Sequence, residues 1–413
     1  MMRPLALLAL AAAPLVLTAA AVPAQAQELR PVGPTTAAFT LDAEVQDGGQ
    51  QVVSLTIDVR GLGINPRSLS DDAFSVRASG TSPDPSVPGP VLGTFEDVDR
   101  PVADVRLEPG GRLVVDLEDG FGTPGAGTLG YSVGAGRNVE LDLEYTLTQV
   151  KPLTARGVSD FRFAALEQSR LVDDEVEAFA PGEANGLAYR LFSPKERGLR
   201  PLVVWLHGGG EGGREGSYDN DLVLQANRGA LGFATEEAQD AFGGAYVLAP
   251  QAPDFWLNDP ARGYSAQLKG LIDEVVASHR VDTSRIYVVG ASNGGYMTAQ
   301  LTADNPGFFA ADVPIAAVRE YDDAVVLTDE ELAAMSSTPT WVVHAENDET
   351  VPFEPNGKYI AEHVDGALLS AYPDVAYDGI TYDGHWSWIY VGRNDPTTPD
   401  GTHVWQWMAA QRL

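Results

Sequence analysis

A serine set between glycines is the first candidate for chemistry. Residues 290–294 read Gly-Ala-Ser-Asn-Gly, directly after the apolar run "RIYVV" and before the helix-like stretch "GYMTAQLTA". At a sharp turn from strand to helix, small neighbours let the two elements approach closely and hold the serine side chain up as a nucleophile. A tight turn that only small residues fit is the alternative. The strand-turn-helix context favours Ser292 as a nucleophile.

A serine nucleophile requires a general base, and the base requires an acid that orients it. Downstream of Ser292, the run "TPTWVVHAENDETVP" ends in acidic residues just beyond an apolar strand. Asp348 is the expected acid because it lies in the loop where that acid is needed. Glu346 and Glu349 are its neighbouring rivals, and solvated loop charges are the alternative for all three.

Three histidines follow the expected acid. His363 falls in "KYIAEHVDG", which reads as a helix surface, and His403 lies near the end of the chain. His385 lies in "YDGHWSW", a loop led by a glycine that would let the ring swing toward Ser292. The sequence therefore predicts His385 as the base.

A glycine cluster at an earlier strand end predicts an oxyanion hole. "VVWLHGGGEGG" places His207 and three glycines after the first strong apolar strand. Glycines let the backbone turn its N–H groups into a pocket, and the expected donors are the amides of Gly209, Gly210 and Asn293. A phosphate-binding loop is disfavoured because no Gly-Lys-Ser/Thr follows and the chain is acidic. His207 itself is expected to hold the loop by hydrogen bonds.

Aromatic residues near these motifs could form the acyl or alcohol pocket. Trp256 in "APDFWLND" and Trp386 each lie in a loop after a strand, and Tyr296 follows the serine turn. We expect these three to contact substrate. Core packing is the alternative, above all for Tyr296 and Trp388.

The chain has two halves that differ in the spacing of their apolar residues, and these halves must position the candidate residues. From about residue 34 to residue 150, short runs such as "QVVSLTIDVR" and "RLVVDLED" alternate apolar and polar residues between turn-rich separators. About seven such strands predict a β-sandwich of immunoglobulin type. After "KPLTARGVSD", fully apolar runs alternate with helix-length stretches, which predicts a mostly parallel sheet flanked by helices. Chemistry in such sheets collects at the carboxyl ends of the strands.

Composition narrows the setting. The chain has 413 residues and a net charge of −31, which argues against nucleic acid and anionic membrane surfaces as partners. It contains no cysteine, which removes thiol nucleophiles and cysteine metal sites. Arg3, an uncharged apolar stretch and the small-x-small end Ala24-Gln25-Ala26 predict a signal peptide over residues 1–26. A membrane anchor is the alternative reading of that segment.

The motifs together resemble a known superfamily. "LHGGGEGG", "VDTSRIYVVGASNGGYMT", "HAENDETVP" and "DGHWSW", in the order serine, acid, histidine, resemble an α/β-hydrolase. They are similar to its secreted esterase and "predicted peptidase" branch, with polyhydroxybutyrate depolymerases, feruloyl esterases and the catalytic domain of prolyl oligopeptidase. Some esterases of this branch carry an immunoglobulin-like domain first. The resemblance implies an immunoglobulin-like domain over residues 27–155 and an α/β-hydrolase domain over residues 156–413.

The expected function is hydrolysis of carboxylic esters by a secreted serine hydrolase through an acyl-enzyme. Short-chain, aryl or feruloyl and polyester substrates all fit, and no metal or organic cofactor is implied. A serine peptidase of the prolyl oligopeptidase type is one alternative. A polymer- or carbohydrate-binding protein with an inactive hydrolase domain is another. We expect an ester substrate as partner, without nucleic acid or stable membrane association, and the sequence leaves the oligomeric state open.

Overall fold

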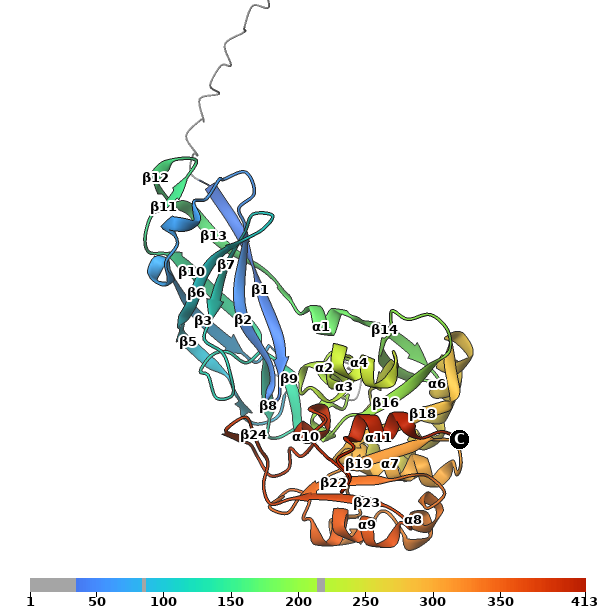
Figure 1. Ribbon diagram of the computed structural model, residues 1–413. Helices are drawn as coiled ribbons and strands as arrows, with labels where there is room; N and C mark the ends of the chain where they lie inside the picture. The colour runs from blue at the N-terminus through green and yellow to red at the C-terminus, as the bar shows by residue number, and fades with distance from the viewer. Residues whose placement is uncertain (1–34, 84–86, 214–219) are drawn as a thin grey trace, which may run out of the picture.

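The computed structural model describes residues 35–83, 87–213 and 220–413 of the chain. The expected signal peptide lies outside the described residues. Two parts lie side by side, a strand-rich part at the start of the chain and a mixed part after it (Figure 1). We call them the β part (residues 35–83 and 87–172) and the α/β part (residues 179–213 and 220–413).

Two sheets of the β part pack on one shared core. Their strands are β1 Thr35–Gln46, β2 Gly49–Asp58, β3 Phe74–Thr81, β5 Phe95–Arg100, β6 Val102–Glu108, β7 Arg112–Leu117, β10 Asp142–Gln149 and β13 Phe163–Val172. The order is β13-β1-β2-β7-β6 in one sheet and β10-β3-β5 in the other. In β3, buried residues alternate with more exposed ones, as the sequence rhythm predicts for a strand with one face on a core. Phe39 and Leu55 of the first sheet meet Val76 and Tyr145 of the second.

The β part extends further along the chain than the expected boundary at residues 155 and 156. Strand β13 pairs in parallel with β1, so the first sheet runs to Val172. The first strand of the second part begins only at Phe179, after helix α1 (Asp174–Glu177). The local rhythm of residues 156–172 could not reveal a pairing with a strand at the other end of the β part.

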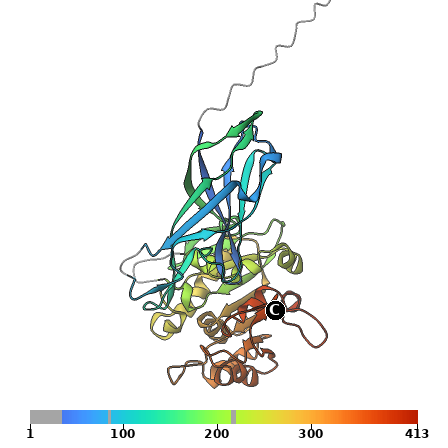
Figure 2. The ribbon, with the colours of Figure 1, turned by 90° about the vertical axis from the view of Figure 1, so that its left-hand side faces the viewer.

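Smaller elements complete the β part. They are the hairpin strands β11 Leu153–Ala155 and β12 Val158–Phe161, the 3-10 turns η1 Pro66–Ser68 and η2 Asp71–Ala73, and the strands β4 Val91–Leu92, β8 Leu129–Ser132 and β9 Arg137–Glu140. Strands β4, β8 and β9 form a three-stranded sheet. It lies at the end of the β part that faces the α/β part, as Figures 1 and 2 show.

An eight-stranded sheet is the centre of the α/β part. Its strands are β14 Phe179–Ala184, β15 Leu187–Phe192, β16 Arg200–Leu206, β17 Tyr246–Pro250, β18 Val281–Ala291, β19 Ala311–Ile315, β22 Trp341–Ala345 and β23 Leu368–Tyr372. The order is β14-β15-β17-β16-β18-β19-β22-β23, or 1-2-4-3-5-6-7-8 counted along the chain. The pairs β14–β15 and β15–β17 are antiparallel, and the other neighbours run parallel.

Helices cover both faces of this sheet (Figure 1). They are α2 Leu222–Gln225, α3 Gly229–Gly232, α4 Glu236–Phe242, α5 Asp259–Arg262, α6 Tyr264–Ser278, α7 Asn293–Asp304, α8 Asp329–Met335, α9 Tyr359–His363, α10 Trp388–Gly392 and α11 Val404–Ala410, with the 3-10 turns η3 Gly209–Glu211 and η4 Trp256–Asn258 and the π-helix η5 Glu354–Lys358. Two hairpins lie outside the sheet, β20 Glu320–Tyr321 with β21 Ala324–Val325 and β24 Ala376–Tyr377 with β25 Ile380–Thr381. Strand β16 shows why a fully apolar run is required. Leu202 and Val204 pack in one core with α6 and α7, whereas Val203 and Trp205 pack in the opposite core with α3, α4 and α11.

One strand belongs to the cores of both parts. In β1, Phe39 and Leu41 pack in the core of the β part, whereas Val45 packs in the core of the α/β part. Arg228 Nη1 donates to the carbonyl oxygen of Val45 over 2.6 Å. Strand β1 therefore ties the two parts together at its far end.

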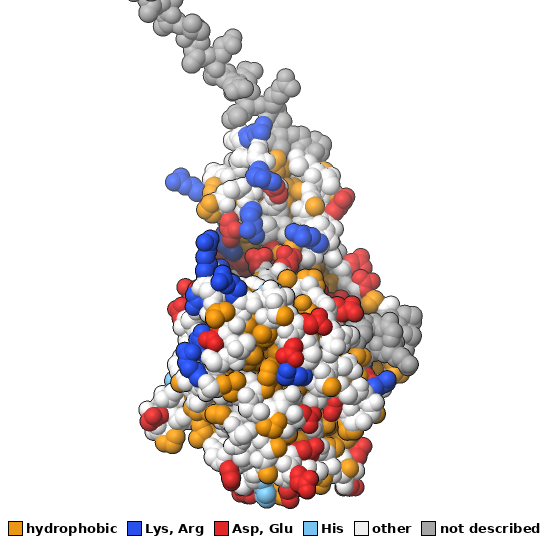
Figure 3. Space-filling view, turned by 90° about the vertical axis from the view of Figure 1, so that its right-hand side faces the viewer, with side chains coloured by type: hydrophobic (Ala, Val, Ile, Leu, Met, Phe, Trp, Pro, Cys, Tyr) orange, Lys and Arg blue, Asp and Glu red, His pale blue; other side chains and the backbone are white. Residues whose placement is uncertain are grey.

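The molecular surface carries both signs of charge. On one face, Lys and Arg side chains gather along one edge, while Asp and Glu side chains spread over the rest (Figure 3). Within the described residues, no helix is both long enough and apolar enough to cross a membrane.

Candidate active site

Ser292 occupies a strained turn between β18 and α7. Its φ of 57° and ψ of −116° lie outside the regions that residues with a Cβ ordinarily adopt. The backbone N–H of Ser292 donates to the carbonyl oxygen of Ile315 over 2.8 Å, which ties the turn to β19. A Cβ added to Gly294 would lie 2.0 Å from the carbonyl oxygen of Leu206, so only glycine lets α7 approach β16 this closely. The turn expected from the motif is therefore present, with the serine at its tip.

His385 lies beside Ser292 although 93 residues separate them in the chain. Its Nε2 is 2.9 Å from Ser292 Oγ, and its Nδ1 is 2.8 Å from Asp348 Oδ2. A Cβ on Gly384 would lie 2.5 Å from Asn347 Oδ1, so the histidine loop packs directly on the loop that carries Asp348. The structure thus brings Ser292, His385 and Asp348 into one hydrogen-bonded line.

Asp348 is buried and fully engaged, while its rivals are not. Its Oδ1 accepts hydrogen bonds from the backbone N–H groups of Thr350 and Val351 over 2.9 and 2.8 Å. Burial alone would raise the pKa of Asp348, but hydrogen bonds from His344 and His385 hold that pKa well below its usual range. The carboxylate is therefore charged at any pH at which His385 could act as a base. Glu346 and Glu349 are exposed.

The other two downstream histidines make local contacts instead. His363 Nδ1 lies 2.8 Å from the carbonyl oxygen of Tyr359, one turn earlier in α9. His403 Nδ1 is 2.5 Å from the carbonyl oxygen of Asn394. Neither of these described contacts involves Ser292 or Asp348.

His344 is a member of the site that the sequence reasoning missed. It is fully buried at the end of β22, and its Nε2 is 3.1 Å from Asp348 Oδ2 and 2.9 Å from the carbonyl oxygen of Val351. Because a carbonyl can only accept, Nε2 carries the proton, and it donates to the same carboxylate oxygen that His385 contacts. The available signal was a histidine inside an otherwise apolar strand, four residues before the expected acid.

The glycine loop after β16 lies against the serine turn. A Cβ on Gly208 would be 3.8 Å from Ser292 Cβ, and one on Gly209 would be 3.7 Å from Asn293 Nδ2. His207 is buried with its Nδ1 2.6 Å from the carbonyl oxygen of Gly208, and its Nε2 accepts from the backbone N–H of Ala252 over 2.9 Å. Burial lowers the pKa of His207 to about 4, so the ring is neutral and holds the loop.

Asn293 contributes its backbone and its side chain differently. It is the first residue of α7, where backbone N–H groups have no partner within the helix and carry partial positive charge. Its side-chain Oδ1 accepts from the backbone N–H of Leu257 over 3.0 Å and so holds η4. The side chain is therefore structural, and the expected role of the backbone N–H as an oxyanion donor stays a prediction.

Glu211 closes the glycine loop and is a second residue missed from the sequence. Its side chain is buried, with Oε1 3.4 Å from Asn138 Nδ2 of the β part. Burial raises the pKa of Glu211 and backbone hydrogen bonds lower it. The effect of burial is larger, so the pKa rises to about 7. Below that pH the carboxyl is neutral, so it adds no negative charge beside a loop expected to bind an oxyanion.

Two of the three expected aromatic contacts lie in the core instead. Trp256 is 0% exposed and packs on His207 and Tyr264, with ring centroids 5.1 and 5.6 Å apart. Tyr296 is 1% exposed in the core cluster that α6 and α7 share. Loop position and closeness to Ser292 suggested contact with substrate, but Trp256 supports the ring of His207 and Tyr296 faces inward from α7. In this structure neither side chain is open to a substrate.

Trp386 remains a candidate wall of the site. It is half-buried, directly after His385, and stacks with Trp388 at a centroid distance of 6.1 Å. Phe121, from the β part, meets its edge at 5.8 Å and an interplanar angle of 81°. Phe121 also lines a groove between the two parts. The aromatic surface beside the histidine thus includes a residue from each part.

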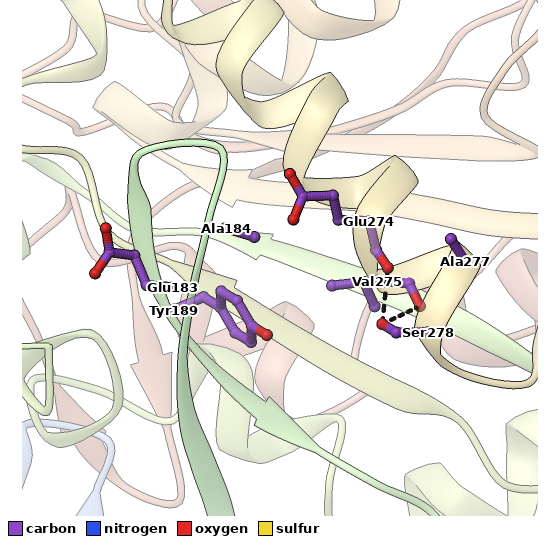
Figure 4. Close-up of a pocket in the computed structure, with 7 residues that line it drawn as sticks. All are labelled: Glu183, Ala184, Tyr189, Glu274, Val275, Ala277 and Ser278. Carbon is purple, nitrogen blue, oxygen red and sulfur yellow. Dashed lines mark hydrogen bonds between the residues drawn. The ribbon is translucent and has the colours of Figure 1, made fainter.

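A separate hollow lies between β15 and α6 (Figure 4). Its polar side chains are Glu183, Tyr189, Glu274 and Ser278. The hydroxyl of Ser278 donates to the carbonyl oxygens of Glu274 and Val275, so it is occupied by its own helix. His279 Nδ1 lies 2.9 Å from this hydroxyl, but it also lies 3.1 Å from the carbonyl oxygen of Val275, which can only accept, so Nδ1 carries a proton and is not a base for Ser278. Within the described residues no cluster of acidic and histidine side chains suits a metal ion either.

The assembled groups have the parts that acyl transfer requires. They are a hydroxyl on a strained turn, an imidazole within hydrogen-bond distance of it, a charged carboxylate behind the imidazole, and a glycine loop packed against the serine turn. The glycine loop, Ser292 and Asp348 follow strands β16, β18 and β22 of the eight-stranded sheet, at the carboxyl edge where such sheets place their chemistry, and His385 follows the hairpin β24–β25.

Comparisons with known proteins match parts of the chain to hydrolases. A sequence model of the prolyl oligopeptidase family matches residues 261–334, which include Ser292 and end before Asp348. NocK of Nocardia uniformis subsp. tsuyamanensis, provisionally named an esterase, is 29% identical over 172 residues, covering 40% of this chain and 48% of that protein. Feruloyl esterase B of Neurospora crassa is 29% identical over 128 residues, covering 29% of this chain and 40% of that protein. In both relatives the matched stretch is less than half of the protein's length.

A solved structure shares the architecture over most of the chain. A thermostable esterase superposes with a TM-score of 0.73 at 24% identity, covering 91% of this chain and 99% of that chain. Coverage that high cannot come from the α/β part alone, so the likeness includes strands of the β part. The likeness and the strand order establish that the later part of the chain has the α/β-hydrolase fold.

Proposed function

We propose that the chain is a secreted serine hydrolase of carboxylic esters that works through an acyl-enzyme. The observation that carries the proposal is the pair of hydrogen bonds in series, 2.9 Å from Ser292 Oγ to His385 Nε2 and 2.8 Å from His385 Nδ1 to Asp348 Oδ2. A base within this distance of a hydroxyl, itself held by a charged carboxylate, is the arrangement that activates serine.

The first step forms the acyl-enzyme. His385 Nε2 takes the proton of Ser292 Oγ as that oxygen bonds to the ester carbonyl carbon. Asp348 holds the ring with Nδ1 protonated and stabilises the imidazolium that forms. The amides of Gly209, Gly210 and Asn293 donate to the carbonyl oxygen as it becomes negative. The C–O bond to the alcohol then breaks, and the alcohol leaves with the proton from His385.

The second step releases the acid. A water molecule gives a proton to His385 Nε2 while its oxygen bonds to the acyl carbon. The bond to Ser292 Oγ breaks, and Ser292 regains the proton from His385. The chain needs no metal or organic cofactor for either step.

The aromatic surface beside His385 indicates the class of substrate. Trp386, half-buried next to the base, suits an apolar acyl or aryl group, which favours short-chain, aryl or feruloyl esters and polyesters. The relatives named as esterases support the same choice. Trp256 and Tyr296 are not part of the proposed pocket because both are buried.

Ser292→Ala tests the proposal. We expect wild-type protein to hydrolyse p-nitrophenyl butyrate and the variant to lose about a million-fold in kcat, as removal of a serine nucleophile does elsewhere. A fluorophosphonate probe should label the wild type at Ser292 and leave the variant unlabelled. Circular dichroism checks that the variant is folded. A folded variant that keeps its activity would overturn the assignment, and a folded wild type without any activity would favour a binding protein.

A peptidase is the second candidate, favoured by the family match over residues 261–334. The same three residues would serve it, so only the leaving group differs. Comparing kcat/KM for p-nitrophenyl esters and for p-nitroanilide peptides separates the two. Turnover of peptides at rates above those of the esters would favour the peptidase.

Two further points belong to this proposal. Secretion after cleavage near Ala26 is supported by the charge and hydropathy pattern of residues 1–26. An immunoglobulin-type sandwich is supported by the two sheets that share one core in the β part. Mass analysis of the mature protein recovered from culture medium tests the first point directly.

A further inference from the structure

Strand β9 of the β part reaches the loop that is expected to form the oxyanion hole. Strand β9 packs against η3, the turn that contains Gly209 and Gly210. Strand β9 pairs with β8 in an antiparallel hairpin, and β4 extends that sheet. The glycine loop is thus covered by residues about 70 positions earlier in the chain.

Arg137 holds one side of this loop. Its side chain is 7% exposed, and its Nη1 lies 3.4 Å from the carbonyl oxygen of Gly212. Its guanidinium carbon lies 4.6 Å from the centre of the Phe255 ring. That ring in turn lies beside Gly209, where an added Cβ would be 3.3 Å from Phe255 Cε1. Arg137 therefore contacts the loop at the carbonyl oxygen of Gly212, and the Phe255 ring contacts it at Gly209.

Asn138 holds the opposite side. A Cβ added to Gly210 would meet Asn138 Nδ2 at 3.0 Å and, among the described atoms, otherwise only Asn138 Cγ within 4 Å. Asn138 Nδ2 also lies 3.4 Å from Glu211 Oε1. The Asn138 side chain thus packs on Gly210 and also contacts the buried carboxyl of Glu211, the next residue.

We propose that the β part completes the catalytic site, with Asn138 and Arg137 as positioning residues that hold Gly209 and Gly210 with their N–H groups toward Ser292. This inference rests on the proposed ester hydrolysis. An oxyanion hole works because its donors are already in place when charge develops. His207 anchors the start of the loop, but Gly209 and Gly210 have no side chains of their own to fix their backbone, so the strand packed on them adds rigidity there.

Asn138→Ala in the full-length protein is the test. Outright removal of an oxyanion donor lowers kcat about 100- to 1000-fold, so we expect loosened donors to lower kcat about 10-fold, with KM changed less than about two-fold. The loss should be smaller for the thionoester analogue, because sulfur is a weak hydrogen-bond acceptor and gains less from the donors. A variant that only destabilised the fold would lower kcat by the same factor for the ester and for the thionoester, so the difference between the two substrates is the discriminating result.

Glu140→Ala is the matched control. Glu140 is in the same strand and also crosses between the parts, but its Oε1 accepts from Gln225 Nε2 of α2 over 3.0 Å, away from the glycine loop. We expect this variant to keep kcat within about two-fold, as ordinary surface substitutions do. Equal losses in Asn138→Ala and Glu140→Ala would overturn the inference, because the interface as a whole would then be responsible.

Gly210→Ala provides a second, independent arm. The added Cβ would crowd Asn138, so we expect kcat to fall in the wild-type background and no further fall when Asn138 is already alanine. Fully additive losses, or a native kcat in Gly210→Ala, would overturn the inference. If Asn138→Ala does not fold, Gly210→Ala alone carries the test.

The outcomes also separate this inference from the proposed function. Wild-type protein that neither hydrolyses esters nor reacts with a fluorophosphonate would refute the proposed function itself. Wild-type protein that does both, with Asn138→Ala unchanged in kcat, would refute only the role of the β part.

Discussion

Neutralising the buried carboxyl beside the oxyanion loop should stabilise the protein in a pH-dependent way. The pKa of Glu211 is raised from 4.5 to about 7 by burial, so the folded state prefers the protonated form. As pH rises from about 4 through 7, the unfolded chain ionises freely while the folded chain resists ionisation, and stability is lost. A rise of this size corresponds to as much as about 3 kcal/mol at pH 8.5. Glu211→Gln keeps the shape and removes the ionisation.

Urea unfolding followed by tryptophan fluorescence measures the effect at pH 4 and pH 8.5. We expect Glu211→Gln and wild type to have similar free energies of unfolding at pH 4, and the variant to be more stable at pH 8.5. Other titrating groups cancel in the difference between the two proteins. Glu349→Gln, which removes an exposed negative charge near the site, is the matched control for the change in net charge.

A gain that is equal at both pH values would refute the reasoning, since it would come from packing and not from ionisation. A loss at pH 8.5 would refute it as well, because it would mean that the folded protein prefers the charged carboxylate. Activity offers a second check. The kcat of the wild type should fall relative to that of the variant as pH rises through 7, because a carboxylate there opposes the oxyanion.

Two other buried groups lead to predictions of the same kind. His344→Leu removes a donor from Asp348 and should lower the free energy of unfolding by about 2–3 kcal/mol at neutral pH, whereas His344→Gln, whose amide can still donate, should lose less. Because the pKa of Asp348 is lowered, the stability that its charged form contributes is present at neutral pH and lost in acid. The difference in free energy of unfolding between His344→Leu and wild type should therefore become smaller as pH falls. A difference that stays constant with pH in urea unfolding would contradict this. Asp312 is fully buried, and burial raises its pKa well above the usual value, so its contribution to the free energy of unfolding is lost as pH rises. Asp312→Asn should therefore be more stable than wild type at pH 7 but not at pH 3. Thermal melts that show no pH-dependent difference between the two proteins would contradict this.

The residues in the line from Ser292 to Asp348 could be found from sequence because each has a local signature. The serine lies between glycines after an apolar run, the acid follows the next but one buried strand of the sheet, and the histidine follows a glycine. Their closeness in space follows from parallel strands, whose carboxyl ends share one edge. The α/β-hydrolase fold was predictable for the same reason.

Other features depend on contacts that no local pattern encodes. His344 and Glu211 matter because of what surrounds them, and burial of a single polar residue is not visible from its neighbours in sequence. Trp256 and Tyr296 fit a pocket by position, but the direction of each side chain is set by tertiary packing on His207 and within the α6–α7 core. The end of the β part at Val172 depends on the pairing of β13 with β1.

Strand β1 has a consequence for how such a chain could change over time. Because Val45 is buried in the core of the α/β part, a lineage that lost its β part would be left with an unfilled gap in the hydrolase core. Leaving a buried aliphatic site empty costs about 1–3 kcal/mol, a large share of the stability of an ordinary domain. Arg228 would also lose its carbonyl partner. Loss of the β part in evolution would therefore require a compensating substitution where the core of the α/β part became exposed. We expect the two parts to be inherited together.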